Sequence, residues 1–194
     1  MSIVLASSSQ IRRAMLEAAN VHVMVDPAQV DEDSIKQGHE GNDRSLALAL
    51  AEEKALETAS RLSGKWIIGG DSLISVDGRR FDKARDRAEA EVHLRAFRGQ
   101  EMTLTSAVAL ARDGAVDWSF ADQARLRVRQ YSDSFIHNYL DAEWPAVSYC
   151  VGVFRMEGPG IQLFERIEGS HFTILGLPLM PLLGALRERG ILAS

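Results

Sequence analysis

A run of serines followed by two arginines is the first segment that could do chemistry. Residues 7–9 are all serine, they follow the apolar run 3–6, and Arg12 and Arg13 come within the next helical turn. A helix start binds anions well because it has free N–H groups and the positive end of a dipole, and the hydroxyls add donors. Two cations there oppose the dipole unless an anion lies between them. A serine cap with two solvated arginines explains the segment equally well, because it lacks the glycines of a P-loop.

Asp71 is the second candidate. It follows WIIGG, which predicts a buried strand, and we expect it at the carboxyl end of that strand, where open α/β sheets place their ligands. Gly69 and Gly70 would let a ligand or another backbone approach closely. A carboxylate in that place can hold Mg²⁺ or take a proton from water. On this residue alone, a turn aspartate that caps a neighbouring N–H group is the simpler interpretation.

Three further charged residues could join Asp71 if the fold brings them there. Lys83 follows an Asp-Gly turn and could return along a hairpin, although most charges in RRFDKARDR should be solvated. Lys54 comes one helical turn after an apolar residue, so it could reach a pocket from the edge of a buried face. Glu32 could supply a second oxygen ligand to a metal. Taken alone, Lys54 and Glu32 are ordinary surface residues.

Other common catalytic patterns are missing from the sequence. The five histidines show no zinc-ligand spacing, and no G-x-S-x-G nucleophile motif occurs. Cys150 is the one cysteine, so no intrachain disulfide can form, and we interpret it as core filling in a protein of the reducing cytosol.

The composition is that of a folded cytoplasmic protein. The chain has 194 residues, 46% of them hydrophobic, which suits one domain or two small lobes. A net charge of -5 argues against a nucleic-acid or membrane partner, because such a surface needs a basic excess. We expect no signal peptide and no membrane helix, since no segment approaches the roughly 20 apolar residues of a span. We therefore expect a single domain over residues 1–194.

Strands and helices mix along the chain, which predicts an α/β or α+β fold that must position these residues. Apolar or alternating runs predict strands over 3–6, 21–25, 102–112, 120–131 and 161–169, and a strand with a hairpin from residue 66. Capped periodic segments predict helices over 10–20, 44–62, 86–97, 132–143 and 176–190. The buried face of the second helix would comprise Leu48, Ala51, Ala55, Ala59 and Leu62. Residues 26–43 read as a loop or a marginal helix.

Taken together, six segments resemble the Maf family of nucleoside triphosphate pyrophosphatases. In chain order they are LASSSQIRR, VDED, LAEEKA, GGDSLISVDGRRFDKA, CVGVFRMEGPG and LFERIEGSHFTILGLPL. The family patterns that they resemble include S-x-S-P-x-R, L-A-x-x-K-A, G-[AS]-D with a hairpin, and A-G-x-[FY]-x-x-[EQ]-G-x-G. The match spans residues 3–190. No single motif is specific, but six in one order are hard to reach by chance.

The resemblance implies a fold and a reaction. The fold would be α/β, an elongated mixed sheet with flanking helices and two lobes around a deep cleft, as in Maf and ITPase-like proteins, and often a homodimer. The reaction would hydrolyse a nucleoside triphosphate to the monophosphate and pyrophosphate with a divalent cation, Mg²⁺ or Mn²⁺. Such chemistry needs charge neutralisation and positioning more than covalent help.

The resemblance also implies residue roles. Asp71 looks like the proton acceptor that readies the attacking water, and Asp71 and Glu32 look like the carboxylates on the metal side. The residues that would bind the substrate phosphates are Ser7, Ser9, Arg12, Arg13, Lys54 and Lys83.

Three positions bear on the nucleotide. A family branch that acts on dTTP and UTP carries Arg, Thr and Gln where this chain has Ile11, Ser72 and Glu157, and a branch resembling 7-methyl-GTP pyrophosphatase carries an aromatic residue, Gln and Glu. Glu157 matches the second branch, and a carboxylate can accept two hydrogen bonds from a guanine edge. Ile11 and Ser72 match neither branch, and Ile11 cannot stack on a base. We therefore expect a guanine-type or modified nucleotide such as 7-methyl-GTP, unless Glu157 is only a loop carboxylate.

Other departures leave alternatives open. Gln10 stands where the family has Pro, DKA replaces G-K-P, and Arg98 replaces a Ser. One alternative is a dTTP/UTP pyrophosphatase, and another is a nucleotide-binding regulator of cell division with little turnover. A phosphatase of small phosphoesters is a third, although the sequence lacks the aspartate-rich nucleophile loop of such enzymes.

Overall fold

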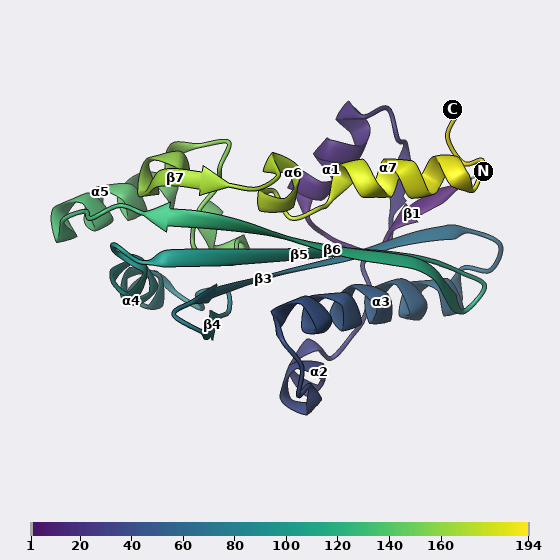
Figure 1. The fold of residues 1–194 in the computed structure, drawn as a ribbon, viewed down its shortest axis with the longest axis horizontal. Helices are drawn as coiled ribbons and strands as arrows, with labels where there is room; N and C mark the ends of the chain where they lie inside the picture. The colour runs from purple at the N-terminus through teal and green to yellow at the C-terminus, as the bar shows by residue number, and fades with distance from the viewer. Residues whose placement is uncertain (1, 194) are drawn as a thin grey trace. The chain divides into compact units, whose positions relative to one another are not determined.

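A mixed β-sheet forms the centre of the fold in the computed structural model, which describes residues 2–193. Strand order in the sheet is β2-β1-β3-β5-β6-β7, with β4 paired to β3 (Figure 1). β1 runs parallel to β2 and β3, whereas β4 is antiparallel to β3 and β7 to β6. The α/β class and the mixed sheet with flanking helices are therefore confirmed. The strands are β1 (Ile3–Leu5), β2 (Val23–Val25), β3 (Trp66–Val76), β4 (Arg79–Phe81), β5 (Glu101–Arg112), β6 (Ala115–Val128) and β7 (Phe164–Glu168).

Side-chain caps fix where most helices begin. The Asp86 and Ser132 side chains accept the N–H groups of Glu89 and Phe135, as the sequence predicts. No helix in the described part of the chain is long and apolar enough to cross a bilayer. The helices are α1 (Gln10–Ala18), α2 (Glu32–Gly38), α3 (Asp43–Arg61), α4 (Arg87–Phe97), α5 (Asp133–Glu143), α6 (His171–Ile174) and α7 (Leu179–Glu188), with 3-10 turns η1 (Ala146–Tyr149) and η2 (Pro159–Leu163).

The chain divides into two compact units. The first comprises the described residues up to Ser72, Thr105–Asp122 and the described residues from His171 onward. The second comprises Leu73–Leu104 and Gln123–Ser170. β3, β5 and β6 contribute residues to both units. The assignment of the whole chain to a single domain stays a prediction.

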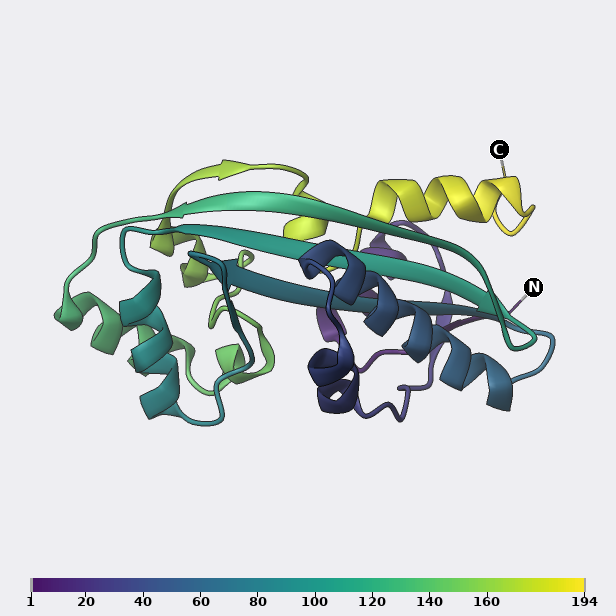
Figure 2. The ribbon, with the colours of Figure 1, turned by 60° about the horizontal axis from the view of Figure 1, so that its bottom comes forward.

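In the first unit, helices cover both faces of the sheet. α3 lies along one face, and α1 and α7 lie along the other (Figure 1; Figure 2). The α1–α7 side encloses a core of apolar residues from β1, β3, β5 and both helices, among them Leu5, Leu16, Ile68, Leu110, Leu182 and Leu186. In the second unit, α4 packs against α5. The Tyr131 hydroxyl donates to the Leu94 carbonyl of α4 at 2.8 Å.

The buried face of α3 differs from the expected one. Leu48 and Leu62 are half-buried, whereas the buried residues of α3 are Leu46, Ala47, Leu50, Ala51, Ala55, Thr58 and Ala59. Small residues in this face let the helix approach β3 closely. A Cβ atom on Gly69 would lie 2.1 Å from the Ala51 carbonyl oxygen. Gly69 therefore allows the backbone of α3 to lie close to β3. This is one of the two roles that the sequence suggested for this glycine.

The expectation that Asp71 ends a strand is wrong. β3 runs unbroken through Gly69, Gly70 and Asp71 to Val76. Its pairing with β1 stops at Ile68, because β1 itself ends at Leu5. β3 continues because β5 pairs with it on its other side, and β4 joins it from Ile74 onward. Asp71 thus lies within the strand, just beyond the part that the parallel neighbour covers.

Several element boundaries also need correction. β6 begins at Ala115, five residues before the expected strand, because the Asp113-Gly114 turn lets it pair at once. Residues 26–43, expected to form a loop or a marginal helix, contain the capped helix α2, so the helix alternative is confirmed there. The expected strand 161–169 begins only at Phe164, since η2 takes its first residues. The expected strand 21–25 is shortened to Val23–Val25.

Candidate functional site

The loop between β1 and α1 is held by its own serines. Ser9 caps α1, and its Oγ accepts the Arg12 N–H at 3.4 Å. The Ser7 Oγ accepts the Ser9 N–H at 3.2 Å. Both serines are half-buried. The two hydroxyls therefore sit at the helix start, where an anion would meet free backbone donors.

Arg12 ties this loop to two other segments. Its Nε donates to the Gly176 carbonyl at 2.8 Å, and its Nη1 donates to the Gly70 carbonyl at 2.9 Å and to Ser7 Oγ at 3.2 Å. Its Nη2 donates to Ser72 Oγ at 3.0 Å. Burial lowers the pKa of the Arg12 guanidinium, and the nearby carboxylates, Asp71 first, raise it. Arginine stays protonated, so Arg12 places a fixed positive charge beside Asp71.

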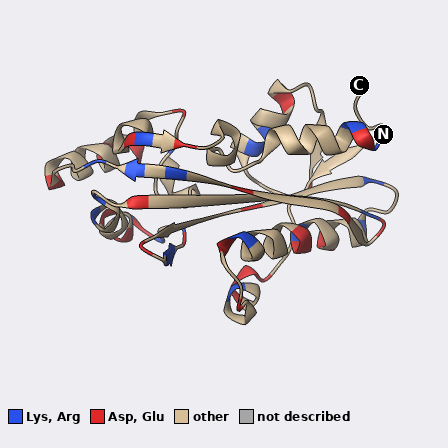
Figure 3. Ribbon diagram, viewed as in Figure 1, with Lys and Arg blue, Asp and Glu red and all other residues tan. Residues whose placement is uncertain are grey.

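Lys54 joins the two candidate carboxylates. Its Nζ lies 2.6 Å from Asp71 Oδ1 and 2.7 Å from Glu32 Oε1. The Lys54 and Asp71 side chains are only 13% and 9% exposed, so water screens the pair weakly. Lys54 comes from α3, which carries both acidic and basic residues (Figure 3). Glu32 of α2, Lys54 of α3 and Asp71 of β3 thus form one charged cluster.

The donor set bears on whether a divalent cation fits. No group of three or more His, Cys, Asp and Glu side chains in the described chain could hold a metal. Asp71 and Glu32 nevertheless share one ammonium and so lie within reach of a common cation. Mg²⁺ usually takes one or two protein carboxylates and completes its shell with water and substrate phosphates. The two carboxylates fit a cation that arrives with a polyanion.

The positions that resemble specificity residues have partners within the first unit. Ser72 is half-buried and bonds to Arg12, and its Oγ also lies 2.9 Å from Ser106 Oγ. Ile11 packs against the apolar core below α1. Ile11 therefore helps to pack α1 against the sheet.

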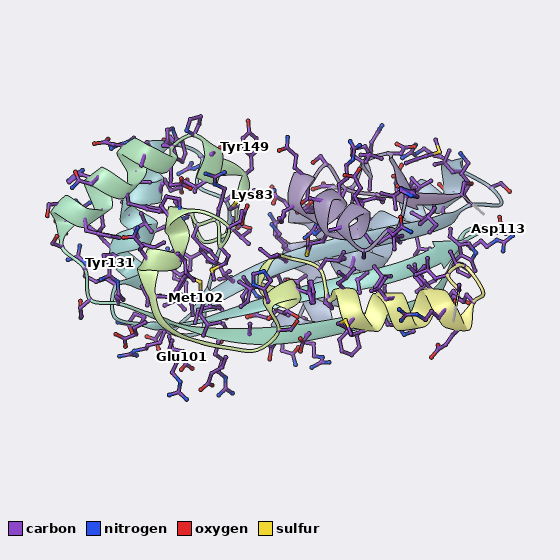
Figure 4. The ribbon with its side chains drawn as sticks, turned by 90° about the horizontal axis from the view of Figure 1, so that it is seen from above. Lys83, Glu101, Met102, Asp113, Tyr131 and Tyr149 are labelled. Carbon is purple, nitrogen blue, oxygen red and sulfur yellow. The ribbon has the colours of Figure 1, made fainter. Side chains whose placement is uncertain are left out.

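Other expected site residues are not part of this cluster. Arg13 points into solvent and pairs with Glu17 at 2.7 Å, with a side chain 57% exposed. Lys83 is exposed in the loop after β4, in the second unit (Figure 4). Glu157 is exposed between η1 and η2, also in the second unit.

Lys83 and Glu157 share a neighbourhood within the second unit. Burial raises the pKa of the Cys150 thiol, Glu157 raises it further, and Arg155 and Lys83 lower it. Both charges therefore lie close enough to affect one thiol. Cys150 is half-buried at the edge of this group and is not deep in the core.

The sequence reasoning missed two groups of polar residues. Ser106 is fully buried and donates to the Thr173 carbonyl at 2.8 Å. In the second unit, buried Glu143 receives two bonds of 2.9 Å from Arg155. The signal for Ser106 was a hydroxyl inside the apolar run SAVALA, since a buried hydroxyl needs a partner. No local signal could have paired Glu143 with Arg155.

This chain matches one family model and is similar to several known proteins. A model described as Maf-like protein matches residues 2–189. A nucleoside triphosphate pyrophosphatase of Granulibacter bethesdensis is 43% identical over 191 residues, 97% of each chain. A 7-methyl-GTP pyrophosphatase of Rhizobium meliloti is 43% identical over 191 residues, covering 97% of this chain and 96% of that protein. Among solved structures, a HAM1 protein from Coxiella burnetii aligns with a TM-score of 0.47 and 14% identity, over 68% of this chain and 74% of its own.

The family match and the relatives both extend over nearly the whole chain, and they include the segments that carry Ser7, Lys54 and Asp71. This protein therefore belongs to the Maf-like protein family.

Proposed function

We propose that the protein hydrolyses a nucleoside triphosphate to the nucleoside monophosphate and pyrophosphate. The observation that carries the proposal is the Lys54 ammonium, which joins Asp71 and Glu32 beside the Arg12 charge. A triphosphate needs clustered cations, and its hydrolysis needs a carboxylate within reach of a water. The names of the relatives, nucleoside triphosphate pyrophosphatase and 7-methyl-GTP pyrophosphatase, support this reaction class. The enzyme would be a hydrolase that acts on acid anhydrides.

The phosphates would be bound by hydroxyls and by cationic side chains. Ser7 and Ser9 offer hydroxyls at the start of α1, and Lys54 offers its ammonium once a phosphate competes with the two carboxylates. Arg12 adds a fixed positive charge. Lys83, exposed in the second unit, would supply a further cation. Fixed cations at the phosphates stabilise the charge that spreads over the transferring group.

Asp71 would take the proton from the attacking water. Its Oδ1 receives the Lys54 hydrogen bond at 2.6 Å, and in the described chain no partner is found for its Oδ2. The second oxygen is thus the one that can accept a hydrogen bond from water. Lys54 holds the carboxylate in place through this hydrogen bond.

Asp71 and Glu32 would hold a divalent cation, Mg²⁺ or Mn²⁺, together with substrate oxygens. When bound, such a cation neutralises phosphate charge and polarises the oxygens that it contacts. The observation in favour is that both carboxylates already converge on one positive centre, the Lys54 ammonium. With both carboxylates engaged in this way, the Lys54 ammonium would be available to the phosphates.

The preferred nucleotide would have a guanine-type base, such as 7-methyl-GTP. Glu157 is an exposed carboxylate that can accept two hydrogen bonds from N1–H and the exocyclic amine of that base. A dTTP/UTP preference is the alternative, because Ser72 is closer in size to the Thr of that branch than to the Gln of the other.

One assay tests the proposal. Purified protein is incubated with Mg²⁺ or Mn²⁺ and a panel that includes 7-methyl-GTP, GTP, UTP and dTTP, and both pyrophosphate and orthophosphate are measured. We expect pyrophosphate from at least one nucleotide. Orthophosphate as the direct product would point to a phosphatase instead. Tight nucleotide binding without any product would point to a regulator that has lost turnover.

A further inference from the structure

Arg12 uses almost all of its hydrogen-bond donors on the protein itself. A guanidinium has five N–H groups in a fixed fork. Four of them are directed to Gly176, Gly70, Ser7 and Ser72. We propose that Arg12 is a positioning residue, which makes the Ser7 hydroxyl a donor toward the substrate, and that Ser106 takes up the hydrogen of Ser72 and so leaves the Ser72 hydroxyl only an acceptor. This inference rests on the proposed function, because it names how the same site receives its ligand.

The Ser7 hydroxyl is left with one role. A serine oxygen can accept two hydrogen bonds and can donate one. The Ser7 Oγ accepts from the Ser9 N–H at 3.2 Å and from Arg12 Nη1 at 3.2 Å, so both of its acceptor positions are filled. In residues 2–193 no acceptor for its hydrogen is found. The Ser7 O–H is therefore set to donate, which suits a phosphate oxygen.

The Ser72 hydroxyl has the opposite role. Ser106 must donate its hydrogen to the Thr173 carbonyl at 2.8 Å, because a carbonyl can only accept. In the 2.9 Å contact between the two serines, Ser72 is then the donor and Ser106 the acceptor. The longer contact of Ser72 Oγ with the Gly176 carbonyl, 3.4 Å, would use the same hydrogen. Since Arg12 Nη2 fills one acceptor position, Ser72 retains one acceptor position and no donor.

Buried neighbours hold this chain of hydrogen bonds in place. Ser106 and Thr173 are both fully buried, and the Thr173 Oγ1 donates to the Asp122 carboxylate at 2.7 Å. Gly176 has a φ of 95°, and a Cβ atom there would lie 3.1 Å from Ser72 Oγ. A side chain at Gly176 would therefore be strained and would crowd Ser72. The hydrogen bonds from Arg12 to Ser72, from Ser72 to Ser106 and from Ser106 to Thr173 therefore all have the same donor-to-acceptor direction.

The arrangement limits what each residue can bind. Arg12 keeps one N–H of Nη2 for a ligand, so it cannot grip a phosphate with two parallel bonds. Ser7 can serve an anion, which only accepts hydrogen bonds. Ser72 can serve a ligand group that donates, such as an N–H of a base, and it has nothing to offer a bare phosphate.

A double-mutant cycle tests this division of roles. Binding of inorganic triphosphate with Mg²⁺ is measured by calorimetry for wild type, Ser7→Ala, Arg12→Lys and the double variant. A hydrogen bond to a charged group contributes about 1.5–3 kcal/mol, so Ser7→Ala should weaken binding about 10-fold or more. In the Arg12→Lys background the same change should cost less than about 3-fold, because Ser7 is no longer oriented. Ser7→Thr, which keeps the hydroxyl, should bind as wild type does.

Three results would overturn the proposal. The first is that the fold losses in triphosphate affinity caused by Ser7→Ala and by Arg12→Lys multiply in the double variant, which would mean that the two residues act independently. The second is a wild type that does not bind inorganic triphosphate at all. The third comes from Ser72→Ala, which remains informative if Arg12→Lys fails to fold. We expect Ser72→Ala to bind triphosphate as tightly as wild type or more tightly, so a 10-fold weakening would contradict an acceptor-only Ser72. Calorimetry measures binding and needs no turnover. A nucleotide panel without pyrophosphate release would therefore refute the proposed function, whereas the binding results of the double-mutant cycle could still be interpreted.

Discussion

At the scale of residues, the positive charge of Lys54 allows the Asp71 and Glu32 carboxylates to lie close together. Asp71 is 6% exposed, and its charge would be costly without a cation next to it. Lys54 supplies that cation and also holds Glu32. The lysine thus stabilises the resting site and provides the charge that a triphosphate would use.

Lys54→Met should therefore damage both stability and activity. It keeps most of the side-chain volume but leaves two carboxylates without their shared cation. We expect the free energy of unfolding to fall by about 2–4 kcal/mol, near the lower range for breaking a buried pair. Urea titration measures this change, and the pyrophosphate assay should show a loss of at least about 100-fold. Lys65→Met, a lysine outside the site, is the matched control. Unchanged activity in Lys54→Met would exclude Lys54 from phosphate binding.

At the scale of elements, the sequence predicted most of the helices and strands, and its errors have physical reasons. Ser132 and Asp86 marked helix starts correctly because a cap is a local signal. The course of β3 past Gly70 depends on pairing with β5, which begins only at Glu101 and lies outside a short window around Asp71. The meeting of Lys54 with Asp71 could be anticipated only from the family resemblance, since the two residues are 17 positions apart and lie on different elements.

The contact between α3 and β3 gives a prediction for glycine. In Gly69→Ala the new Cβ would meet the Ala51 carbonyl oxygen at 2.1 Å and the Ala55 nitrogen at 2.8 Å, both backbone atoms. We expect a loss of about 1–3 kcal/mol in unfolding free energy. Gly184→Ala in α7 meets open space, and it should stabilise the protein by about 0.5–1 kcal/mol. Thermal unfolding of the two variants should therefore shift in opposite directions.

The packing of α4 on β4 gives a prediction for pH. His93 is 8% exposed between Phe81 and Phe97, and its Nδ1 has no partner in the described chain. Burial lowers the pKa of His93, an effect that Glu89 partly opposes. The unfolded chain therefore takes up a proton near pH 6.5 that the folded chain resists, so stability is lost as the pH falls below that value.

The slope for one such proton is at most about 1.4 kcal/mol per pH unit. His93→Leu should flatten this part of the curve of unfolding free energy against pH between about pH 7 and 5. Equal slopes in wild type and His93→Leu would show that another group titrates there.

At the scale of the whole molecule, the candidate residues are divided between two units. The first carries the serines, Lys54, Glu32 and Asp71, and the second carries Lys83 and Glu157. The Glu143–Arg155 pair and the bond from the Tyr139 hydroxyl to the Val153 carbonyl, 2.9 Å, fix the segment before Glu157. One family model spans both units. A cytoplasmic location and a homodimer stay predictions, and sedimentation can test the second.

Glu157→Gln should change the choice of nucleotide more than the rate of hydrolysis. A carboxylate accepts two hydrogen bonds from a guanine edge, whereas a carboxamide accepts with its oxygen only. We expect the ratio of kcat/KM for 7-methyl-GTP to that for UTP to fall by about 10-fold or more, which corresponds to roughly 1.4 kcal/mol. An unchanged ratio would remove Glu157 from base recognition and favour the dTTP/UTP alternative.

The most direct measurement compares Asp71→Asn with wild type on whichever nucleotide gives pyrophosphate. Asp141→Asn, at an exposed aspartate of α5 that pairs with Arg87, is the matched control. We predict that Asp71→Asn loses about 10²–10⁴-fold in pyrophosphate release while it still binds inorganic triphosphate, because the proton acceptor is gone and the cations remain. Release of pyrophosphate by Asp71→Asn at the wild-type rate would contradict the role of this carboxylate, and with it the proposed site.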